Sequence, residues 1–294
     1  MSSLDGLTFD HLVGREIGTS VLLKELARGG MSVIFIAYQR TLKRQIAVKI
    51  LPREFLTHSA AELFRQEAES AAILSHPNIV PIYEVGETED FLFFTMQLIM
   101  GLPLSRILRR TRRHLLPSRR FIPPGRTVGI LSSVLDALDY AHRQHIIHRD
   151  IKPANILIET HTNRPIITDF GIARLLRGPS VETPRVVGTP VYMSPEQILG
   201  GPVDARADIY SVGVMLFEML ATVLPLPPYG TATDLLKLKI GLKDQLFQKR
   251  PSELNPSLNP EMDRIVFKAL AYEKEQRYAS CREFIDDLDR RPCR

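Results

Sequence analysis

The chain has 294 residues, of which 44% are hydrophobic and 24% are charged, and its formal net charge is +5. These proportions are ordinary for a folded globular protein and argue against a disordered chain, and the length fits either two compact lobes or one large α/β unit. The two cysteines, Cys281 and Cys293, lack metal-ligand spacing and argue against a disulfide framework, which indicates a reducing compartment.

Membrane and export signals are not visible in this sequence. The first residues do not combine a basic region with an apolar one, and no uncharged run is long enough for a membrane span. The longest apolar stretch, 209–228, is interrupted by Glu218 and Pro225, so we interpret it as a buried helix. The sequence therefore predicts a cytoplasmic protein without a transmembrane segment.

The N-terminal part of the chain is predicted to be rich in strands. Residues 1–20 lack periodicity and are expected to run over the surface as a flanking segment. Strands are predicted where β-like runs lie between turns, at 21–27, 33–40, 46–51, 82–87 and 91–98. A helix is predicted over 59–75, where Phe64, Glu67, Ala68 and Ala71 share a face. These elements form a small lobe over about 21–96.

Beyond a hinge at about 97–101 the pattern becomes helical. Apolar residues and one histidine recur at spacings of three and four at Val128, Leu131, Leu135, Leu138 and His142, and further helices are predicted at 208–222, 261–270 and 280–289. The predicted fold class is α+β, with a small N-terminal lobe and a larger, mainly helical lobe over about 102–290, then a tail of 291–294. A cleft between two such lobes is a favoured place for a ligand.

A basic stretch opens the helical part. It holds seven arginines and no acid: Arg106, Arg109, Arg110, Arg112, Arg113, Arg119 and Arg120. Its apolar residues allow a helix that packs on one side and exposes arginines on the other: Leu104, Ile107, Leu108, Leu115 and Leu116. We first interpret the arginines as the solvent-exposed face of this helix. The alternatives are a surface that binds an acidic substrate, a membrane or nucleic acid. The lack of interleaved aromatic residues weakens the last alternative.

The strongest chemical signal is the run His148-Arg149-Asp150-Ile151-Lys152-Pro153-Ala154-Asn155, followed nineteen positions after Asp150 by Asp169-Phe170-Gly171. Asp150 can orient a hydroxyl group and accept its proton, and Lys152 can neutralise a phosphoryl group in transit. Asn155 and Asp169 supply hard oxygen ligands of the kind that Mg²⁺ prefers. The pattern therefore predicts a phosphoryl-transfer site.

These motifs resemble the protein kinase family, and in particular the bacterial branch of eukaryotic-like Ser/Thr kinases. The likeness runs from about Val21 to about Arg290. It implies a bilobal kinase fold. It also implies an enzyme that transfers the γ-phosphoryl group of ATP to Ser/Thr hydroxyls of proteins and uses Mg²⁺ or Mn²⁺ as the metal. Lys49 would reach the α- and β-phosphates, and Glu67 would hold Lys49 in place.

The glycine-rich loop departs from the family pattern. The usual G-x-G-x-x-G-x-V is replaced by the residues from Ala27 to Ile34, so that only the middle glycine is kept. Alanine and serine are the smallest replacements, and backbone N–H groups must approach phosphate closely here. The resemblance assigns the nucleotide to Leu26, Ala27, Arg28, Gly29, Gly30, Met31, Ser32, Ile34, Ala47, Lys49, Met96, Gln97, Ile99, Leu157 and Asp169.

The resemblance also implies a regulated segment after Asp169. Thr183 would be phosphorylated by the protein itself, and Arg149 would receive that phosphate. Thr189, together with Lys152, is typical of Ser/Thr specificity.

Supporting residues follow from the same resemblance. His148 would be a packed, hydrogen-bonded histidine, and Asp208 would hydrogen-bond the loop at 148–155, which matches the catalytic loop of the family. Glu196 and Arg277 would form a buried ion pair.

Two other functions stay open. A pseudokinase that binds nucleotide without transfer is suggested by the missing loop glycines, and a small-molecule phosphotransferase is disfavoured by the segment from Gly188 to Glu196, which serves protein substrates in the family. The expected partners are protein substrates and ATP, with a homodimer implied by resemblance and no DNA or RNA.

Overall fold

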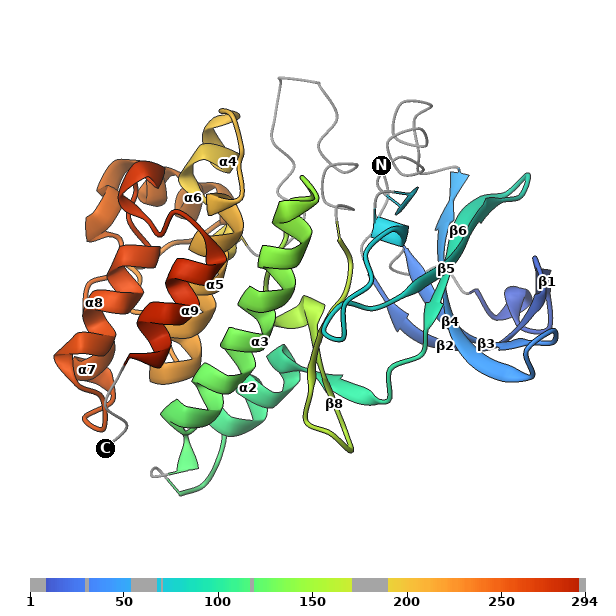
Figure 1. Cartoon of the computed structure of the whole chain (residues 1–294), viewed down its shortest axis with the longest axis horizontal. Helices are drawn as coiled ribbons and strands as arrows, with labels where there is room; N and C mark the ends of the chain where they lie inside the picture. The colour runs from blue at the N-terminus through green and yellow to red at the C-terminus, as the bar shows by residue number, and fades with distance from the viewer. Residues whose placement is uncertain are drawn as a thin grey trace. The chain divides into compact units, whose positions relative to one another are not determined.

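The structure is a computed structural model that describes residues 9–29, 32–53, 68–69, 71–116, 119–170 and 190–290. Its described residues group into two units, one up to Met100 and the other from Gly101 onward. The first unit is built on strands and the second mainly on helices, as Figure 1 shows. The α+β class is thereby confirmed.

The first unit contains a six-stranded antiparallel sheet with the order β1-β2-β3-β4-β6-β5. Its strands are β1 (Glu16–Ile17), β2 (Ser20–Arg28), β3 (Val33–Gln39), β4 (Arg44–Pro52), β5 (Ile82–Glu87) and β6 (Phe91–Gln97). The five predicted strands are confirmed to within two residues at each end. The short β1 has no counterpart among the predictions.

The two faces of this sheet have different roles because side chains alternate along a strand. On β4, Val48 and Ile50 point to a hydrophobic core that includes Phe35 of β3 and Phe93 of β6. Ala47 and Lys49 occupy the alternate positions and therefore point to the opposite face. Register thus separates the positions that stabilise the sheet from those predicted to meet the nucleotide.

The N-terminal segment packs on the core face. Phe9 is 7% exposed, Leu12 of the 3₁₀ turn η1 (Asp10–Leu12) is 3% exposed, and Ile17 of β1 is 1% exposed. The expectation that residues 1–20 run over the surface is therefore wrong for the described residues from Phe9 onward. Three apolar residues at irregular spacing bury as effectively as a periodic set, but they leave no periodic signal.

The predicted helix over 59–75 falls largely outside the described residues, and Phe64 and Glu67 lie there. The described residues of this region are helical at 68–69 and 71–72. Ala68, Ala71 and Leu74 are buried, in agreement with the predicted apolar face.

The second unit combines a small sheet with helices. The sheet has the order β7-β8-β9, formed by β7 (Gly101–Pro103), β8 (Ile156–Glu159) and β9 (Pro165–Ile167). The helices are α2 (Leu104–Arg112), α3 (Pro124–Arg143), α4 (Pro195–Leu199), α5 (Arg206–Ala221), α6 (Ala232–Leu242), α7 (Pro251–Leu254), α8 (Pro260–Ala269) and α9 (Cys281–Asp289). Short 3₁₀ turns are η4 (Pro153–Asn155), η6 (Pro190–Tyr192), η7 (Lys243–Gln245) and η8 (Lys274–Gln276).

Helix α5 is the centre of the second unit. Nearly all of its residues are buried, and it contacts α3 and α8. A Cβ atom added at Gly213 would lie 2.8 Å from Cβ of Ala269, so α5 and α8 approach closely there. The prediction of a buried helix is confirmed.

Within the described parts of the chain, none of the helices combines the length and apolarity needed to cross a bilayer.

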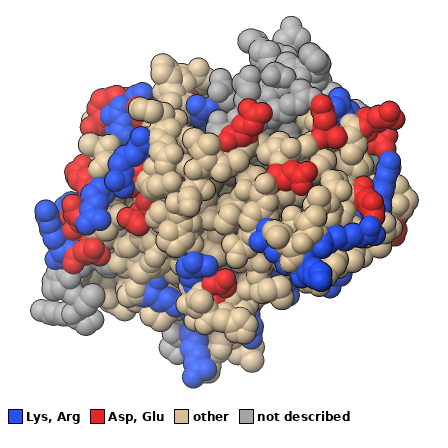
Figure 2. Space-filling view, turned by 45° about the vertical axis from the view of Figure 1, so that its right-hand side comes forward, with Lys and Arg blue, Asp and Glu red and all other residues tan. Residues whose placement is uncertain are grey.

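The arginine-rich stretch forms α2 and the turn that follows it. Leu104 and Leu108 are buried, as expected for the packed side of the helix. Leu115 and Leu116, however, are 91% and 52% exposed, so their predicted place on the packed side is wrong. The reason is that α2 ends at Arg112, which takes both leucines off the helical repeat. Figure 2 shows lysine and arginine atoms at the lowest end of this unit, where Figure 1 draws the turn after α2.

Candidate active site

Asp150, Lys152 and Asn155 form one hydrogen-bonded cluster. Lys152 Nζ donates to Asp150 Oδ2 over 2.7 Å, and Asn155 Nδ2 donates to the same oxygen over 3.0 Å. Asn155 Nδ2 also donates to the Asp150 carbonyl over 2.8 Å, which fixes the loop around the carboxylate. The Asp150 side chain is 31% exposed. One carboxylate oxygen is thus held by a cation and an amide, and Oδ1 accepts no hydrogen bond from any described residue.

Asn155 and Asp169 lie at the same end of the β8–β9 hairpin. Ile156 pairs with Ile167, so the residues just before β8 and just after β9 are brought together. Thr168 N donates to the Asn155 carbonyl over 2.9 Å and continues the ladder by one step. The hairpin therefore brings Asn155 and Asp169 close together, although they lie fourteen positions apart in the sequence.

This donor set fits a hard divalent cation. Asn155 uses its Nδ2 atom for both of its hydrogen bonds, so its amide oxygen accepts none within the described residues. Asp169 supplies a carboxylate from a left-handed backbone conformation with φ of 61°, which aspartate tolerates better than most residues. Mg²⁺ characteristically takes one or two such ligands and completes its shell with phosphate and water oxygens.

The catalytic loop is attached to the core through Asp208. Its carboxylate, on α5, accepts hydrogen bonds from the backbone N–H of His148 at 2.9 Å and of Arg149 at 2.8 Å. His142 Nε2 lies 2.8 Å from the same carboxylate. Burial alone would raise the pKa of Asp208, but the hydrogen bond and charge of His142, together with the hydrogen bond from the His148 backbone, hold that pKa below its usual value. The predicted link between Asp208 and the loop is confirmed.

Arg149 has a left-handed backbone with φ of 65°, which costs a non-glycine residue free energy. The surrounding bonds hold it there, because Gln197 Nε2 donates to the Arg149 carbonyl over 2.9 Å while Asp208 accepts from its N–H. Gln197 was not among the predicted residues. Its role depends on a contact across 48 positions, for which the sequence has no local signal.

His148 is a packed histidine, as predicted, with no exposed surface. Its Nδ1 accepts from the Asp150 N–H at 3.2 Å, and its Nε2 lies 2.9 Å from the Thr168 carbonyl. A neutral ring with its hydrogen on Nε2 satisfies both contacts. The ring also lies 4.6 Å from that of Phe170. His148 therefore joins the catalytic loop to the chain on either side of Asp169.

Glu196 and Arg277 form the predicted ion pair. Arg277 Nη1 and Nη2 donate to the two carboxylate oxygens of Glu196 over 2.8 and 2.9 Å, and the Arg277 side chain has no exposed surface. Its remaining donors reach the carbonyls of Ala271, Tyr272 and Arg206. Burial would raise the pKa of Glu196, but the Arg277 hydrogen bonds outweigh that effect and lower it.

This shift makes the stability of the chain sensitive to acid. A carboxyl group whose pKa is lower in the folded chain than in the unfolded chain stabilises the fold at pH values above its ordinary pKa of 4.5. This contribution is lost as the pH falls through the lower pKa that the group has in the folded chain. We expect Glu196→Gln to be less stable than the unaltered chain near neutral pH and to lose less additional stability on acidification. Urea unfolding over a series of pH values measures this, and equal slopes for the two proteins would contradict it.

Lys239 is a structural residue that sequence reasoning missed. It lies on α6, is 1% exposed, and donates through Nζ to the carbonyl of Val191 over 2.6 Å and to that of Met193. Burial, and then the charge of Arg277, lower the pKa of Lys239 well below its ordinary value. The sequence does contain a signal for this role. Lys239 follows Leu236 by three residues and Leu235 by four, which places a lysine on the apolar face of a helix.

Lys49 lies in the first unit and is 5% exposed, which is unusual for a lysine on a strand. Its Nζ lies 5.8 Å from the centre of the Phe94 ring. Ile34 pairs with Lys49, and Met96 pairs with Ala47, so these predicted nucleotide residues share one face of the sheet.

Further predicted nucleotide residues lie at other positions. Gln97 ends β6, and Ile99 follows it, 9% exposed. Leu157 belongs to β8 of the second unit. Gly30, Met31 and Glu67 lie outside the described residues.

The predicted glycine-rich loop is the connection between β2 and β3. Ala27 pairs with Ile34 and Arg28 pairs with Val33, and Gly29 N donates to the Ser32 carbonyl over 2.8 Å. The hairpin is therefore closed on either side of the two undescribed residues. Leu26 is 49% exposed, and Arg28 pairs with Glu25 at 2.6 Å.

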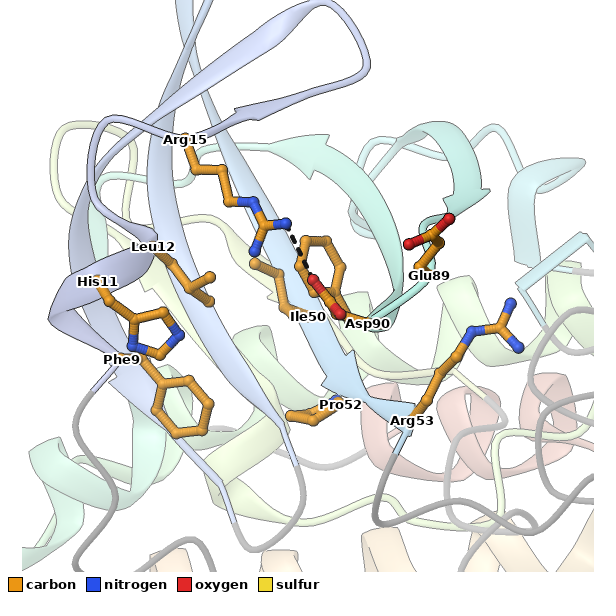
Figure 3. Close-up of a pocket in the computed structure, with 10 residues that line it drawn as sticks. Phe9, His11, Leu12, Arg15, Ile50, Pro52, Arg53, Glu89 and Asp90 are labelled. Carbon is orange, nitrogen blue, oxygen red and sulfur yellow. Dashed lines mark hydrogen bonds and ion pairs between the residues drawn. The ribbon is translucent and has the colours of Figure 1, made fainter.

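A pocket of about 540 Å³ lies on the core side of the first unit, as Figure 3 shows. Arg15 and Asp90 form an ion pair of 2.9 Å across it. Its lining residues are Phe9, His11, Leu12, Arg15, Ile50, Pro52, Arg53, Glu89, Asp90 and Phe91. Of the predicted nucleotide residues that the structure describes, none lines it, because Ile50 and Ala47 project from opposite faces of β4.

Comparisons with known proteins agree on one family. The family model described as "Protein kinase domain" matches residues 20–287. A probable serine/threonine-protein kinase of Streptomyces coelicolor is 37% identical over 90% of this chain, and the serine/threonine-protein kinase PrkC of Bacillus subtilis is 33% identical over 94%. The chain covers 38% and 41% of those two proteins. The crystal structure of the Mycobacterium tuberculosis PknI kinase domain matches with a TM-score of 0.74 and 26% identity, covering 94% of this chain and 97% of that one.

Proposed function

This chain belongs to the protein kinase domain family, and we propose that it transfers the γ-phosphoryl group of ATP to serine and threonine hydroxyls of proteins. The observation that carries the proposal is the cluster of Asp150, Lys152 and Asn155 beside the hairpin end that bears Asp169. Relatives that bear the name serine/threonine-protein kinase support the choice of acceptor, although the chain spans only about two-fifths of their length.

Each residue of the cluster has a role that follows from its position. Asp150 orients the acceptor hydroxyl through its Oδ1 atom and takes the proton late in the transfer, when little basicity is required. Lys152 holds the other oxygen and counters charge on the transferred group. Because the loop is fixed to α5 through Asp208, Asp150 is positioned before a substrate arrives.

ATP and a divalent ion, Mg²⁺ or Mn²⁺, are the proposed cofactors. Asn155 and Asp169 would hold the metal, which supplies charge neutralisation at the phosphates when bound. Lys49, held by Glu67, would bind the α- and β-phosphates, and the apolar face around Ala47 would accept the adenine. These roles are carried over from the family to matching positions of this chain.

Regulation by phosphorylation of Thr183 is part of the proposal. Thr183 and Thr189 lie outside the described residues, so the support comes from Arg149, the residue proposed to bind the phosphate. Arg149 Nε is buried and has no hydrogen-bond partner among the described residues, as expected of a guanidinium that binds a phosphate in another state. Dimerisation stays a prediction, and the buried free thiol of Cys281 is compatible with the proposed cytoplasmic location.

The test is transfer of label from γ-labelled ATP in the presence of Mg²⁺, to the chain itself and to a general Ser/Thr substrate protein. We expect phosphoserine or phosphothreonine to form, and Lys49→Met to abolish it while the protein still melts cooperatively. Nucleotide binding without any transfer would instead identify a pseudokinase, and label on a small molecule alone would also contradict the proposal.

A further inference from the structure

The arginine-rich stretch has a composition unlike the rest of the chain. Residues 91–135 contain eight arginines, no lysine and no carboxylate, whereas the net charge of the whole protein is only +5. An ordinary solvated surface mixes both signs. A region with one sign and one type of cation therefore needs a further explanation.

All but one of the seven arginines in the predicted stretch lack the carboxylate partners that surface arginines commonly have. Arg112 pairs with Glu218 at 3.2 Å. The remaining members of the predicted stretch are exposed, and within the described part of the chain no carboxylate forms an ion pair with them: Arg106, Arg109, Arg110, Arg113, Arg119 and Arg120. Elsewhere in the same unit, Arg264 pairs with both Glu261 and Asp287.

Two leucines project between the arginines. Leu115 is 91% exposed and Leu116 is 52% exposed. The turn that presents them is held by hydrogen bonds, because Leu116 N donates to His114 Nδ1 over 3.1 Å and Arg120 Nε donates to the His114 carbonyl over 2.9 Å. The second of these bonds brings the Arg120 guanidinium to His114, which directly follows Arg113, so the turn that carries the leucines begins beside arginines.

We infer that this surface, α2 with the turn at 113–116 and Arg119 and Arg120, docks on an anionic phospholipid bilayer. Guanidinium groups pair with phosphate in a bidentate geometry that lysine cannot form, which agrees with the exclusive use of arginine. Exposed leucines beside them can enter the interfacial layer of a bilayer, which needs no complementary pocket.

Other partners fit these observations less well. Nucleic-acid surfaces commonly add aromatic side chains on which bases stack, and here the exposed apolar residues are leucines. An acidic protein would need a pocket for Leu115, which projects from a turn. This inference is independent of the proposed phosphoryl transfer, since none of these residues belongs to the cluster around Asp150.

The test is co-sedimentation of the whole chain with vesicles. We expect binding to vesicles of phosphatidylcholine and phosphatidylserine mixed two to one, weakening with added salt, and no binding to pure phosphatidylcholine. The variant Arg109→Gln, Arg110→Gln, Arg113→Gln should lower the partition coefficient by about fivefold per arginine, or on the order of a hundredfold in total. Leu115→Ser with Leu116→Ser should lower it by about tenfold or more.

A matched control removes the same charge elsewhere. Arg40→Gln, Arg282→Gln, Arg290→Gln changes the net charge equally at exposed positions outside this surface, and we expect binding to be nearly unchanged. Equal losses in both triple variants would mean that only net charge matters and would overturn the inference. Full binding by the leucine variant, or tighter binding to a single-stranded oligonucleotide than to the mixed vesicles, would overturn it as well. Thermal melting verifies that each variant is folded.

Discussion

Replacing Asp150 with asparagine is expected to lower the rate of phosphoryl transfer by about a hundredfold to ten-thousandfold, the range typical for loss of a positioned acid-base group. The substitution keeps the shape of the side chain but removes its negative charge. Lys152 Nζ, which lies 2.7 Å from Oδ2, would face an amide instead of a carboxylate. The acceptor hydroxyl would lose the group that orients it and takes its proton. The measurement is the single-turnover rate with saturating ATP and Mg²⁺.

The control for this experiment is Asp289→Asn, which removes one exposed carboxylate at the end of α9 and should leave the rate unchanged. Nucleotide affinity separates the possible causes. Because Asp150 is assigned to the acceptor, Asp150→Asn should bind ATP about as well as the unaltered chain. Transfer at an undiminished rate in Asp150→Asn would show that the cluster around it is not the site of reaction.

Replacing Arg277 with methionine is expected to lower the free energy of unfolding by about 3–5 kcal/mol, as found when one partner of a buried ion pair is removed. Methionine fills a similar volume but donates no hydrogen bond. The change would leave the Glu196 carboxylate without its cation, and the carbonyls of Ala271, Tyr272 and Arg206 without their donors. Urea unfolding followed by circular dichroism measures the loss.

Two further variants show whether the pair itself is responsible. Arg277→Lys keeps the charge but cannot donate in a bidentate geometry, so it should fall between methionine and the native residue. Arg282→Met removes an arginine that is 64% exposed and pairs with Asp286, and should change stability by no more than about 0.5 kcal/mol. A loss for Arg277→Met as small as that for Arg282→Met would contradict the role assigned to it.

Short-range order in this protein was predictable from its sequence. The strands of the first unit follow from their β-like runs, and α3, α5, α8 and α9 follow from helical periodicity. The proximity of Asp150, Lys152 and Asn155 follows from their closeness in the chain. Motif resemblance extended the prediction to distant pairs, such as Glu196 with Arg277, which periodicity alone cannot join.

What the sequence did not reveal depends on long-range packing or on where an element stops. Gln197 and Lys239 each donate to a backbone carbonyl about fifty residues away. Every residue has such a carbonyl, so the residue type does not mark which one will be the partner. Phe9 and Leu12 bury without periodicity. Leu115 was assigned to a packed face because the end of α2 at Arg112 is not marked by glycine or proline at that point.

The attachment of the catalytic loop to α5 has a consequence for how this chain can change. Asp208 sits inside the most deeply buried helix of the second unit, yet its carboxylate carries the backbone of His148 and Arg149. A substitution that shifts α5, for example at the tight approach of Gly213 to Ala269, would move the loop with it. We therefore expect substitutions in the interior of the second unit to change the position of Asp150 together with the stability of the fold.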